Sequence, residues 1–246
     1  MIKSIIKRIP FLVKIYHYYK NLSQRKEIEK ILKLKTNQEK FSKIYKVNFW
    51  GDKASASGPG SNLNNTSDTI YKLEKIIKNY NIKSIVDAPC GDFFWMKKVL
   101  SKNPYLKYCG IDIVEEIIKI NNKNFSNNKI KFYKKDIINT FIPKSDLIIC
   151  RDFLIHLSNK DTKTFLSNLK SSNFKYLLIN GYESNIYQIN NNEIKTGDFR
   201  EINIFKNPIN FSNKFTLKFE DHKYQNKTTS YKSYLYLFEK KKIFKF

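Results

Sequence analysis

The sequence predicts an α/β protein with a doubly wound, mostly parallel seven-stranded sheet. Three observations support this prediction. Short β-rich segments alternate with helical segments from residue 82 onward, a single glycine turn follows the first strand, and two strand-like segments without an intervening helix close the chain. With 246 residues, of which 41% are hydrophobic, the chain can bury one sizeable core.

Five segments are expected to be strands, and they should pair in parallel because strands and helical segments alternate along the chain. They are residues 84–88, 105–112, 130–136, 146–150 and 176–180. Helices are expected over residues 66–80, with Thr66 or Ser67 as the cap, 92–101 and 114–124, and helical material follows the fourth strand to residue 172. A short polar link joins segments 215–222 and 231–240, so these two strands should pair antiparallel.

Residues 1–65 are predicted to be a helical extension with a lid-like loop, and residues 66–246 to be the α/β domain. Apolar residues recur at helical spacing near the N-terminus, and Pro10 interrupts them. The basic, amphipathic pattern of residues 1–20 fits contact with a membrane surface or packing against the domain, and the second interpretation is favoured.

The formal charge of +24 raises the question of a nucleic-acid partner. Only 4 of the 46 basic residues are arginine, and the lysines are spread from end to end, which argues against such a partner. The three cysteines lack C-x-x-C spacing, so neither a zinc site nor a disulfide framework is expected. The sequence has no 20-residue apolar run and no signal-peptide cleavage site, and a cytoplasmic protein is expected, with peripheral contact at the inner membrane surface as an addition.

The most informative segment is Val86–Asp92, where a strand ends, the chain turns at Gly91 and a helix is expected to follow. Such a turn directs backbone N–H groups at a ligand that lies across the strand ends. Asp87 and Asp92 would repel a pyrophosphate but attract the ammonium group of an amino-acid-bearing ligand. The G-x-G-x-x-G pattern is absent, which argues against a nicotinamide-dependent oxidoreductase. An ordinary strand-to-helix turn is the alternative interpretation.

Two further carboxylates follow the next two strands. Asp112 ends the second strand, where an acidic side chain can accept hydrogen bonds from both hydroxyls of a ribose. Asp136 ends the third strand and can accept from the amino group of an adenine, while Ile137 would cover the ring. Three strand-end carboxylates in succession predict one site for a nucleotide-like ligand.

These segments carry a resemblance to a known family. DAPCGD, GID, KDI and DLIICRD resemble the successive nucleotide-binding motifs of class I S-adenosylmethionine-dependent methyltransferases. The closing antiparallel pair also resembles the sheet of that family. The SASGPGS loop and the GDFREINIF segment resemble a narrower group of methyltransferases found among bacterial capsule-biosynthesis enzymes. The first motif of the family usually has more glycines than DAPCGD.

The resemblance implies S-adenosyl-L-methionine as the cofactor. It implies that the ribose is bound by Asp112 with its neighbour Ile113, and the adenine by Asp136 and Ile137. Arg151, at the end of the fourth strand, would lie beside the methionine part. The residues of the first motif that would hold the methionine part are Asp87, Ala88, Gly91 and Asp92.

Asp152 and His156 are the candidate catalytic residues. If the chain is helical after Asp152, the two residues lie four apart on one face. Asp152 would then orient the imidazole, and His156 would take a proton from an acceptor hydroxyl. The alternative, given equal weight, is a histidine that packs beside the pocket, because an acceptor of low pKa needs no base.

Arg200, in the long connection after the fifth strand, has two interpretations. Its guanidinium fork could clamp a phosphate or carboxylate of the acceptor, or it could form a surface ion pair with Asp198 or Glu201. The loop around residues 57–61 could close over the cofactor, bind an anion or serve as a structural crossover. The other candidate acceptor residues are Ser57, Ser61, Tyr182 and Glu183.

Together these observations predict a small-molecule methyltransferase that acts on oxygen. The expected acceptor is a sugar, a nucleotide sugar or a phosphate- or phosphoramidate-type precursor of a bacterial surface polysaccharide, and the capsule setting is implied by the resemblance alone. Two alternatives stay open: an RNA methyltransferase on the same fold, and a non-catalytic S-adenosylmethionine-binding protein.

Overall fold

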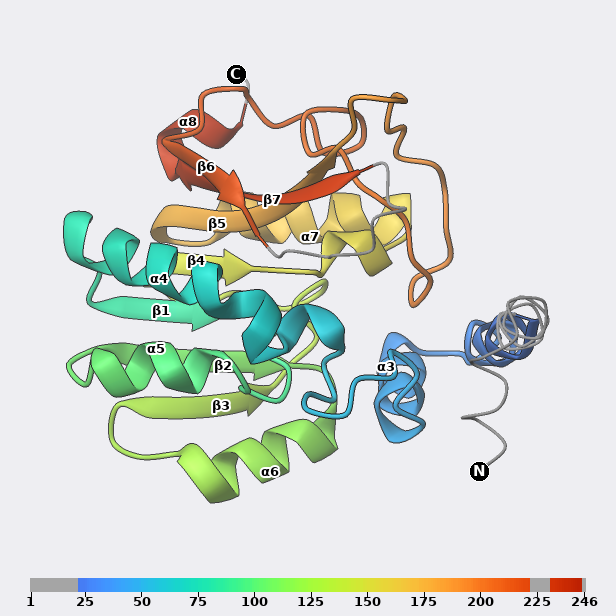
Figure 1. Ribbon diagram of the computed structural model, residues 1–246, viewed down its shortest axis with the longest axis horizontal. Coiled ribbons are helices and arrows are strands. Elements are labelled where there is room, and N and C mark those ends of the chain that lie inside the picture. The colour runs from blue at the N-terminus through green and yellow to red at the C-terminus, as the bar shows by residue number, and fades with distance from the viewer. Residues whose placement is uncertain (1–21, 222–230, 245–246) are drawn as a thin grey trace, which may run out of the picture.

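The computed structural model describes residues 22–221 and 231–244. A seven-stranded sheet with the order β3-β2-β1-β4-β5-β7-β6 forms its centre (Figure 1). Strands β1 to β5 pair in parallel and β6 pairs antiparallel with β7, as predicted. Strand β7 also pairs antiparallel with β5, which was not predicted. The strands are β1 (Ser84–Asp87), β2 (Lys107–Asp112), β3 (Ile130–Lys134), β4 (Ser145–Cys150), β5 (Phe174–Glu183), β6 (Leu217–Glu220) and β7 (Lys232–Glu239).

Helices connect and cover these strands. They are α3 (Asn37–Lys46), α4 (Leu63–Asn79), α5 (Met96–Lys102), α6 (Glu115–Phe125), α7 (Asn159–Ser171) and α8 (Lys240–Ile243). Residues 22–31 are also helical, and residues 59–61 and 154–156 form short 3-10 helices. The amphipathic stretch 1–20 lies outside the described residues.

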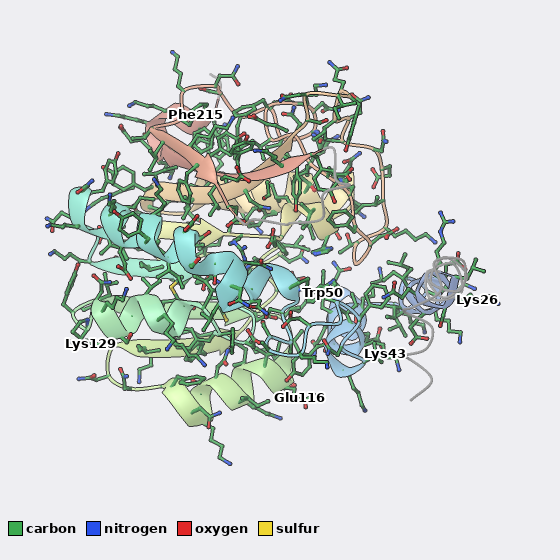
Figure 2. The ribbon with its side chains drawn as sticks, in the orientation of Figure 1. Lys26, Lys43, Trp50, Glu116, Lys129 and Phe215 are labelled. Atoms are coloured by element: carbon green, nitrogen blue, oxygen red, sulfur yellow. The ribbon has the colours of Figure 1, made fainter. Side chains whose placement is uncertain are left out.

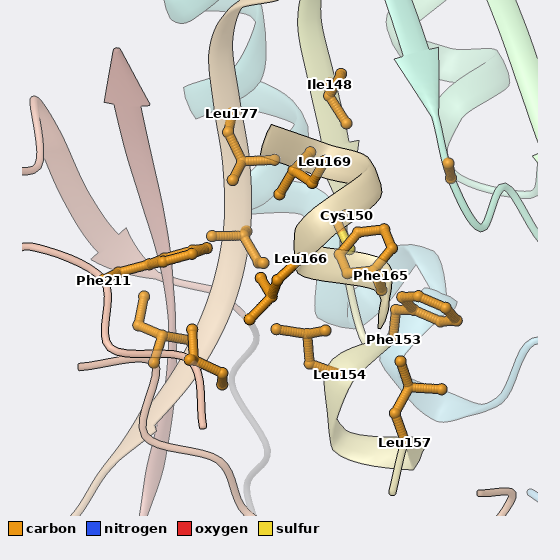
Figure 3. Close-up of a cluster of buried hydrophobic side chains, with 14 of the residues drawn as sticks. Ile148, Cys150, Phe153, Leu154, Leu157, Phe165, Leu166, Leu169, Leu177 and Phe211 are labelled. Carbon is orange, nitrogen blue, oxygen red and sulfur yellow. The ribbon is translucent and has the colours of Figure 1, made fainter. Parts of the chain in front are cut away.

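Apolar side chains bury the sheet on both faces. On one face α4, α5 and α6 contribute Leu73, Met96 and Ile118. On the other face Phe165 and Leu169 of α7 pack against the inner strands (Figure 3). Strands that are covered on both sides consist of nearly continuous apolar residues, which is why the sequence revealed them.

Of the element boundaries that differ from the prediction, three have a clear local cause. Helix α4 begins earlier because the side chain of Asn62 caps it, and Thr66 lies in the first turn, where its hydroxyl donates to the Asn62 carbonyl. Helix α5 begins only at Met96 because Gly91 and Phe93 have φ angles of +53° and +60°, which no α-helix can contain. Strand β5 extends to Glu183 because its second half pairs with β7.

Helix α3 lies beyond the carboxyl ends of the parallel strands (Figure 1). A capping box starts it: the Thr36 hydroxyl accepts from the Glu39 N–H, and the Glu39 carboxylate accepts from the Thr36 N–H. The Asn37 side chain donates to Asp161 of α7 over 3.1 Å, which fixes the helix to the domain. In the part of the chain that the structure describes, no helix is both long enough and apolar enough to span a bilayer.

Candidate functional site

A crevice opens at the carboxyl ends of the parallel strands, which is where open α/β sheets bind ligands. It encloses about 990 Å³, including the part open to solvent. Trp50 lies at this edge, between the sheet and α3 (Figure 2). The predicted site residues that line the crevice are Ser57, Ser61, Asp87, Gly91, Asp92, Asp112, Ile113, Asp136, Ile137, Arg151, Asp152 and His156.

Asp87 forms the floor of the crevice at the tip of β1. Its side chain is almost fully buried, and it accepts a 2.8 Å hydrogen bond from the Tyr108 hydroxyl. Burial raises the pKa of Asp87 to about 7, although the Tyr108 hydroxyl and the Arg151 guanidinium both oppose this shift. A carboxyl group in this state is stabilised as the anion when a cationic group comes close.

The glycine turn and the tip of β2 are joined directly. The Gly91 N–H donates to Asp112 Oδ2 over 3.0 Å, and the Val114 N–H donates to Oδ1 over 2.9 Å. Each carboxylate oxygen therefore accepts at least one backbone hydrogen bond, and its position is fixed by these donors. A Cβ on Gly91 would overlap the Ser57 hydroxyl, so the turn requires glycine for space as well as for its φ angle.

Asp136 and Ile137 follow β3 on the far side of the crevice. Asp136 accepts from the Ile138 N–H over 3.0 Å and from the Asn139 amide over 2.7 Å, so its carboxylate has a fixed orientation. Ile137 is 5% exposed and adds an apolar surface beside it. This pairing of an oriented acceptor with an apolar surface suits the edge and face of a planar base.

Asp92 has a role that the sequence did not predict. Its carboxylate accepts from the Ser55 hydroxyl at 2.9 Å, the Ala56 N–H at 2.8 Å and the Ser57 hydroxyl at 3.1 Å. The Asp92 N–H also donates to the Ser57 hydroxyl over 3.0 Å. Asp92 therefore anchors the loop over the crevice, and its oxygens are already engaged by the protein.

Arg151 links three parts of the crevice wall. Its Nε donates to both oxygens of Asp221 at 2.9 Å, Nη1 lies 3.2 Å from Asp152 Oδ2, and Nη2 donates to the Gly60 carbonyl at 2.8 Å. The guanidinium lies 5.7 Å from the ring centre of Trp95. The end of β4, the loop above the crevice and the residue after β6 are thus held together by one buried cation.

The predicted relation between Asp152 and His156 is wrong. Asp152 has a φ angle of +54°, and the following residues form a single 3-10 turn, so the two residues do not share a helical face. The Asp152 carboxylate instead accepts from the Asn180 amide over 2.8 Å. His156 Nδ1 lies 2.7 Å from the Asp198 carbonyl oxygen, and its ring centre lies 5.3 Å from that of Trp50. Burial lowers the pKa of His156.

Four other predicted residues do not line the crevice. Arg200 is 6% exposed, and its guanidinium donates to uncharged oxygens of the protein, so both predicted roles, anion clamp and surface ion pair, are wrong. Glu183 accepts from Lys218 and from the Tyr236 hydroxyl, so it is engaged away from the crevice. The other two are Ala88, which is buried in the core, and Tyr182, which packs against Phe199 and Tyr231.

Aromatic residues from outside the strand tips also line the crevice, and they were not predicted from the sequence. Phe41 and Tyr45 come from α3, Trp50 from the segment after it, and Trp95 from the turn before α5. The spacing of Phe41 and Tyr45 puts both on one face of a helix, which was the available signal. In the structure that face borders the crevice.

The crevice is acidic although the chain carries a net charge of +24. Among the described residues, its lining contains the cations Lys135 and Arg151 and the acidic residues Asp87, Asp92, Asp112, Asp136 and Asp152. The same part of the chain holds no cluster of His, Cys, Asp and Glu arranged to bind a metal ion. A cationic ligand is therefore favoured in the crevice.

The strand order and the crevice can be compared with known proteins. No family model matches the chain, and no curated protein matches it. A solved structure of magnesium protoporphyrin IX methyltransferase from Synechocystis PCC 6803, with bound S-adenosylhomocysteine, aligns with a TM-score of 0.52 at 15% identity, over 82% of this chain and 98% of that one.

Two further solved structures agree. The methyltransferase domain of bacterial CtHen1 aligns with a TM-score of 0.53 at 12% identity, over 72% of this chain and 100% of that one. The O-methyltransferase of a polyketide synthase multienzyme from Brevibacillus brevis, in complex with S-adenosyl-L-homocysteine, gives 0.50 at 12% identity, over 69% and 71%. The chain has a methyltransferase fold. The predicted fold class is confirmed.

Proposed function

We propose that this protein is an S-adenosylmethionine-dependent methyltransferase that methylates a hydroxyl group of a small molecule. The observation that supports the proposal most is the set of three carboxylates at neighbouring strand tips, Asp87, Asp112 and Asp136, which open into one crevice. Their order along the sheet matches the order of ammonium, ribose and base in this cofactor.

The residues present fit the chemistry of the cofactor. Asp87 would attract the ammonium group, and the Asp112 carboxylate, oriented by the Gly91 and Val114 N–H groups, would accept the ribose hydroxyls. Asp136 and Ile137 would bind the edge and the face of the adenine. When bound, the cofactor supplies a methyl group on a sulfonium, which is already activated for transfer. The protein then has to align the acceptor and exclude water.

His156 is proposed as the base that takes the proton from the acceptor hydroxyl. It lines the crevice beside Trp50, and its lowered pKa keeps the imidazole neutral, as a base must be, in neutral solution. The nearby carboxylate of Asp152 favours the protonated form, so it would stabilise the imidazolium that results.

The acceptor is proposed to be a sugar or nucleotide sugar of a bacterial surface polysaccharide pathway. The ring of Trp50 lies beside His156 in the crevice, and the apolar face of a sugar ring packs well on such a ring. The capsule setting is carried by the resemblance of the SASGPGS and GDFREINIF segments. Arg200 plays no part in this proposal, because it does not line the crevice. An RNA acceptor is disfavoured because the lysines are spread from end to end and only four basic residues are arginine.

Calorimetric titration of the full chain with S-adenosylmethionine tests the cofactor, and a methyl-transfer screen with nucleotide sugars tests the acceptor. Saturable binding and methylation of a sugar hydroxyl are expected. His156→Gln should keep cofactor affinity and lower kcat by about 100-fold, the usual contribution of a general base. A wild-type kcat in His156→Gln would mean that His156 is not the base and only packs beside the crevice. Cofactor binding without any transfer would favour the non-catalytic alternative, and absence of binding would contradict the proposal.

A further inference from the structure

The loop that contains Arg200 is attached to the backbone around His156. The Arg200 N–H donates to the Ile155 carbonyl over 3.0 Å, and the Gly197 N–H donates to the His156 carbonyl over 2.8 Å. Between these two bonds the Asp198 carbonyl oxygen lies 2.7 Å from His156 Nδ1. These backbone hydrogen bonds fix the position of the loop relative to the 3-10 turn, and the contact between the Asp198 carbonyl and the imidazole depends on that position.

The Arg200 side chain fastens the same two segments from inside. It is 6% exposed, and Nη2 donates to the Leu157 carbonyl over 2.8 Å while Nη1 donates to Asn159 Oδ1 over 2.7 Å. Nη1 also donates to the Asn192 carbonyl. All these acceptors are uncharged, so the guanidinium is buried for its fork of donors, which a single ammonium cannot reproduce.

The contact with Asp198 determines which imidazole nitrogen carries the proton. A backbone carbonyl oxygen can only accept, so in neutral His156 the proton is on Nδ1 and Nε2 keeps the lone pair. An imidazole without this contact would exchange between both tautomers, and part of the population would lack a basic Nε2. The position of the loop therefore determines the fraction of His156 that is in the reactive, Nδ1-protonated tautomer.

We propose that Arg200 is a positioning residue that holds the Asp198 carbonyl against His156 and so keeps the imidazole in the Nδ1-protonated tautomer. The catalytic consequence rests on the proposed function, in which His156 is the base. The tautomer itself does not depend on that function and is measured separately.

Long-range ¹H–¹⁵N NMR spectra of the full chain read the tautomer directly. The sequence has three histidines, His17, His156 and His222, and His156→Gln identifies the signals of interest. Wild-type protein should give one pyrrole-like Nδ1 and one pyridine-like Nε2. Arg200→Met should give averaged nitrogen shifts, and Arg200→Lys should give intermediate ones. The control Arg25→Met removes an exposed arginine and should leave the spectrum unchanged.

Asn159→Ala removes one acceptor of the guanidinium without changing Arg200 and decides the question if Arg200→Met does not fold. It should shift the tautomer populations in the same direction. In the activity assay, both variants should lower kcat by about 10-fold and leave the KM for S-adenosylmethionine unchanged, since the cofactor residues lie elsewhere. A folded variant that keeps the single Nδ1-protonated signature would overturn the proposal. If the chain transfers no methyl group, the proposed function fails, but the NMR spectra still test whether Arg200 determines the tautomer of His156.

Discussion

At the scale of single residues, Asp112 connects the glycine turn to the predicted ribose site. Its oxygens accept backbone hydrogen bonds from Gly91 and from Val114, and it is 7% exposed. Burial raises its pKa, and these N–H donors counteract the shift. The charge of this residue and its fixed position together make it the most sensitive point of the proposed cofactor site.

Asp112→Asn should weaken S-adenosylmethionine binding by about 10- to 100-fold. The amide keeps one acceptor oxygen for the backbone but presents N–H donors where a second acceptor is needed, and hydrogen bonds to charged groups contribute about 1.5–3 kcal/mol. Calorimetric titration measures the change. Unaltered affinity in a folded variant would refute the assignment of Asp112 to the ribose.

Sequence reasoning located the strand-tip carboxylates but not the roles of Asp152 and Arg200. Carboxylates at strand ends follow from local pattern, because an apolar run fixes where a strand stops. The backbone of Asp152 is left-handed, which few sequence signals indicate. The partners of Arg200 are mainly backbone oxygens, one of them 43 residues away in sequence, and these carry no signature in the residue types.

At the scale of elements, the crevice has a floor of strand tips and a roof formed by α3 and the loop after it. The roof is attached to the domain at a few defined points: Asn37 to Asp161, the Gly60 carbonyl to Arg151, and the loop to Asp92. The aromatic side chains Phe41 and Tyr45 of α3 line the crevice, where a bound ligand would contact them. The roof should therefore become more rigid when a ligand fills the crevice.

Asp92→Ala should release the loop without unfolding the domain. It removes the acceptor of the Ser55 hydroxyl, the Ala56 N–H and the Ser57 hydroxyl, so amide exchange over residues 54–58 should accelerate and cofactor affinity should fall. Hydrogen-exchange mass spectrometry measures the first effect. Ser57→Ala, which loses only its own two bonds to Asp92, should give a smaller increase. Equal exchange in all three proteins would mean that Asp92 does not hold the roof.

Element types were predictable because periodicity and apolar runs extend over many residues, whereas their starts depend on single dihedral angles. The late start of α5 follows from the positive φ angles of Gly91 and Phe93. Of these two residue types only glycine commonly adopts such an angle, so the sequence indicates it at one position only. The role of α3 could not be predicted because its aromatic side chains line a crevice whose other walls are formed by residues much later in the sequence.

At the scale of the whole molecule, an acidic crevice is set in a chain of net charge +24. The floor of that crevice is the buried Asp87, whose pKa is raised to about 7. The unfolded chain ionises this group at an ordinary acidic pH, so the native state binds one more proton between about pH 4 and pH 7. Native stability from this group is therefore present below that window and is lost as the pH rises through it.

Asp87→Asn should remove this pH dependence. The free energy of unfolding of Asp87→Asn, minus that of the wild type, should increase by up to ~2 kcal/mol between about pH 5 and pH 7 and then level off. Urea denaturation of the ligand-free proteins at several pH values measures this difference. Because the other titrating groups are common to both proteins, a difference that stays constant with pH would contradict the raised pKa of Asp87.

The ion pair between Arg151 and Asp221 also affects when the crevice becomes able to bind a ligand during synthesis of the chain. The lining of the crevice is contributed by residues 41–156, yet the carboxylate that receives Nε of Arg151 is made 70 residues after that arginine. A nascent or truncated chain that ends before Asp221 would contain the full set of lining residues and still leave a buried cation without its main counter-charge. We therefore expect ligand-binding competence to appear only after β6 has emerged from the ribosome and docked.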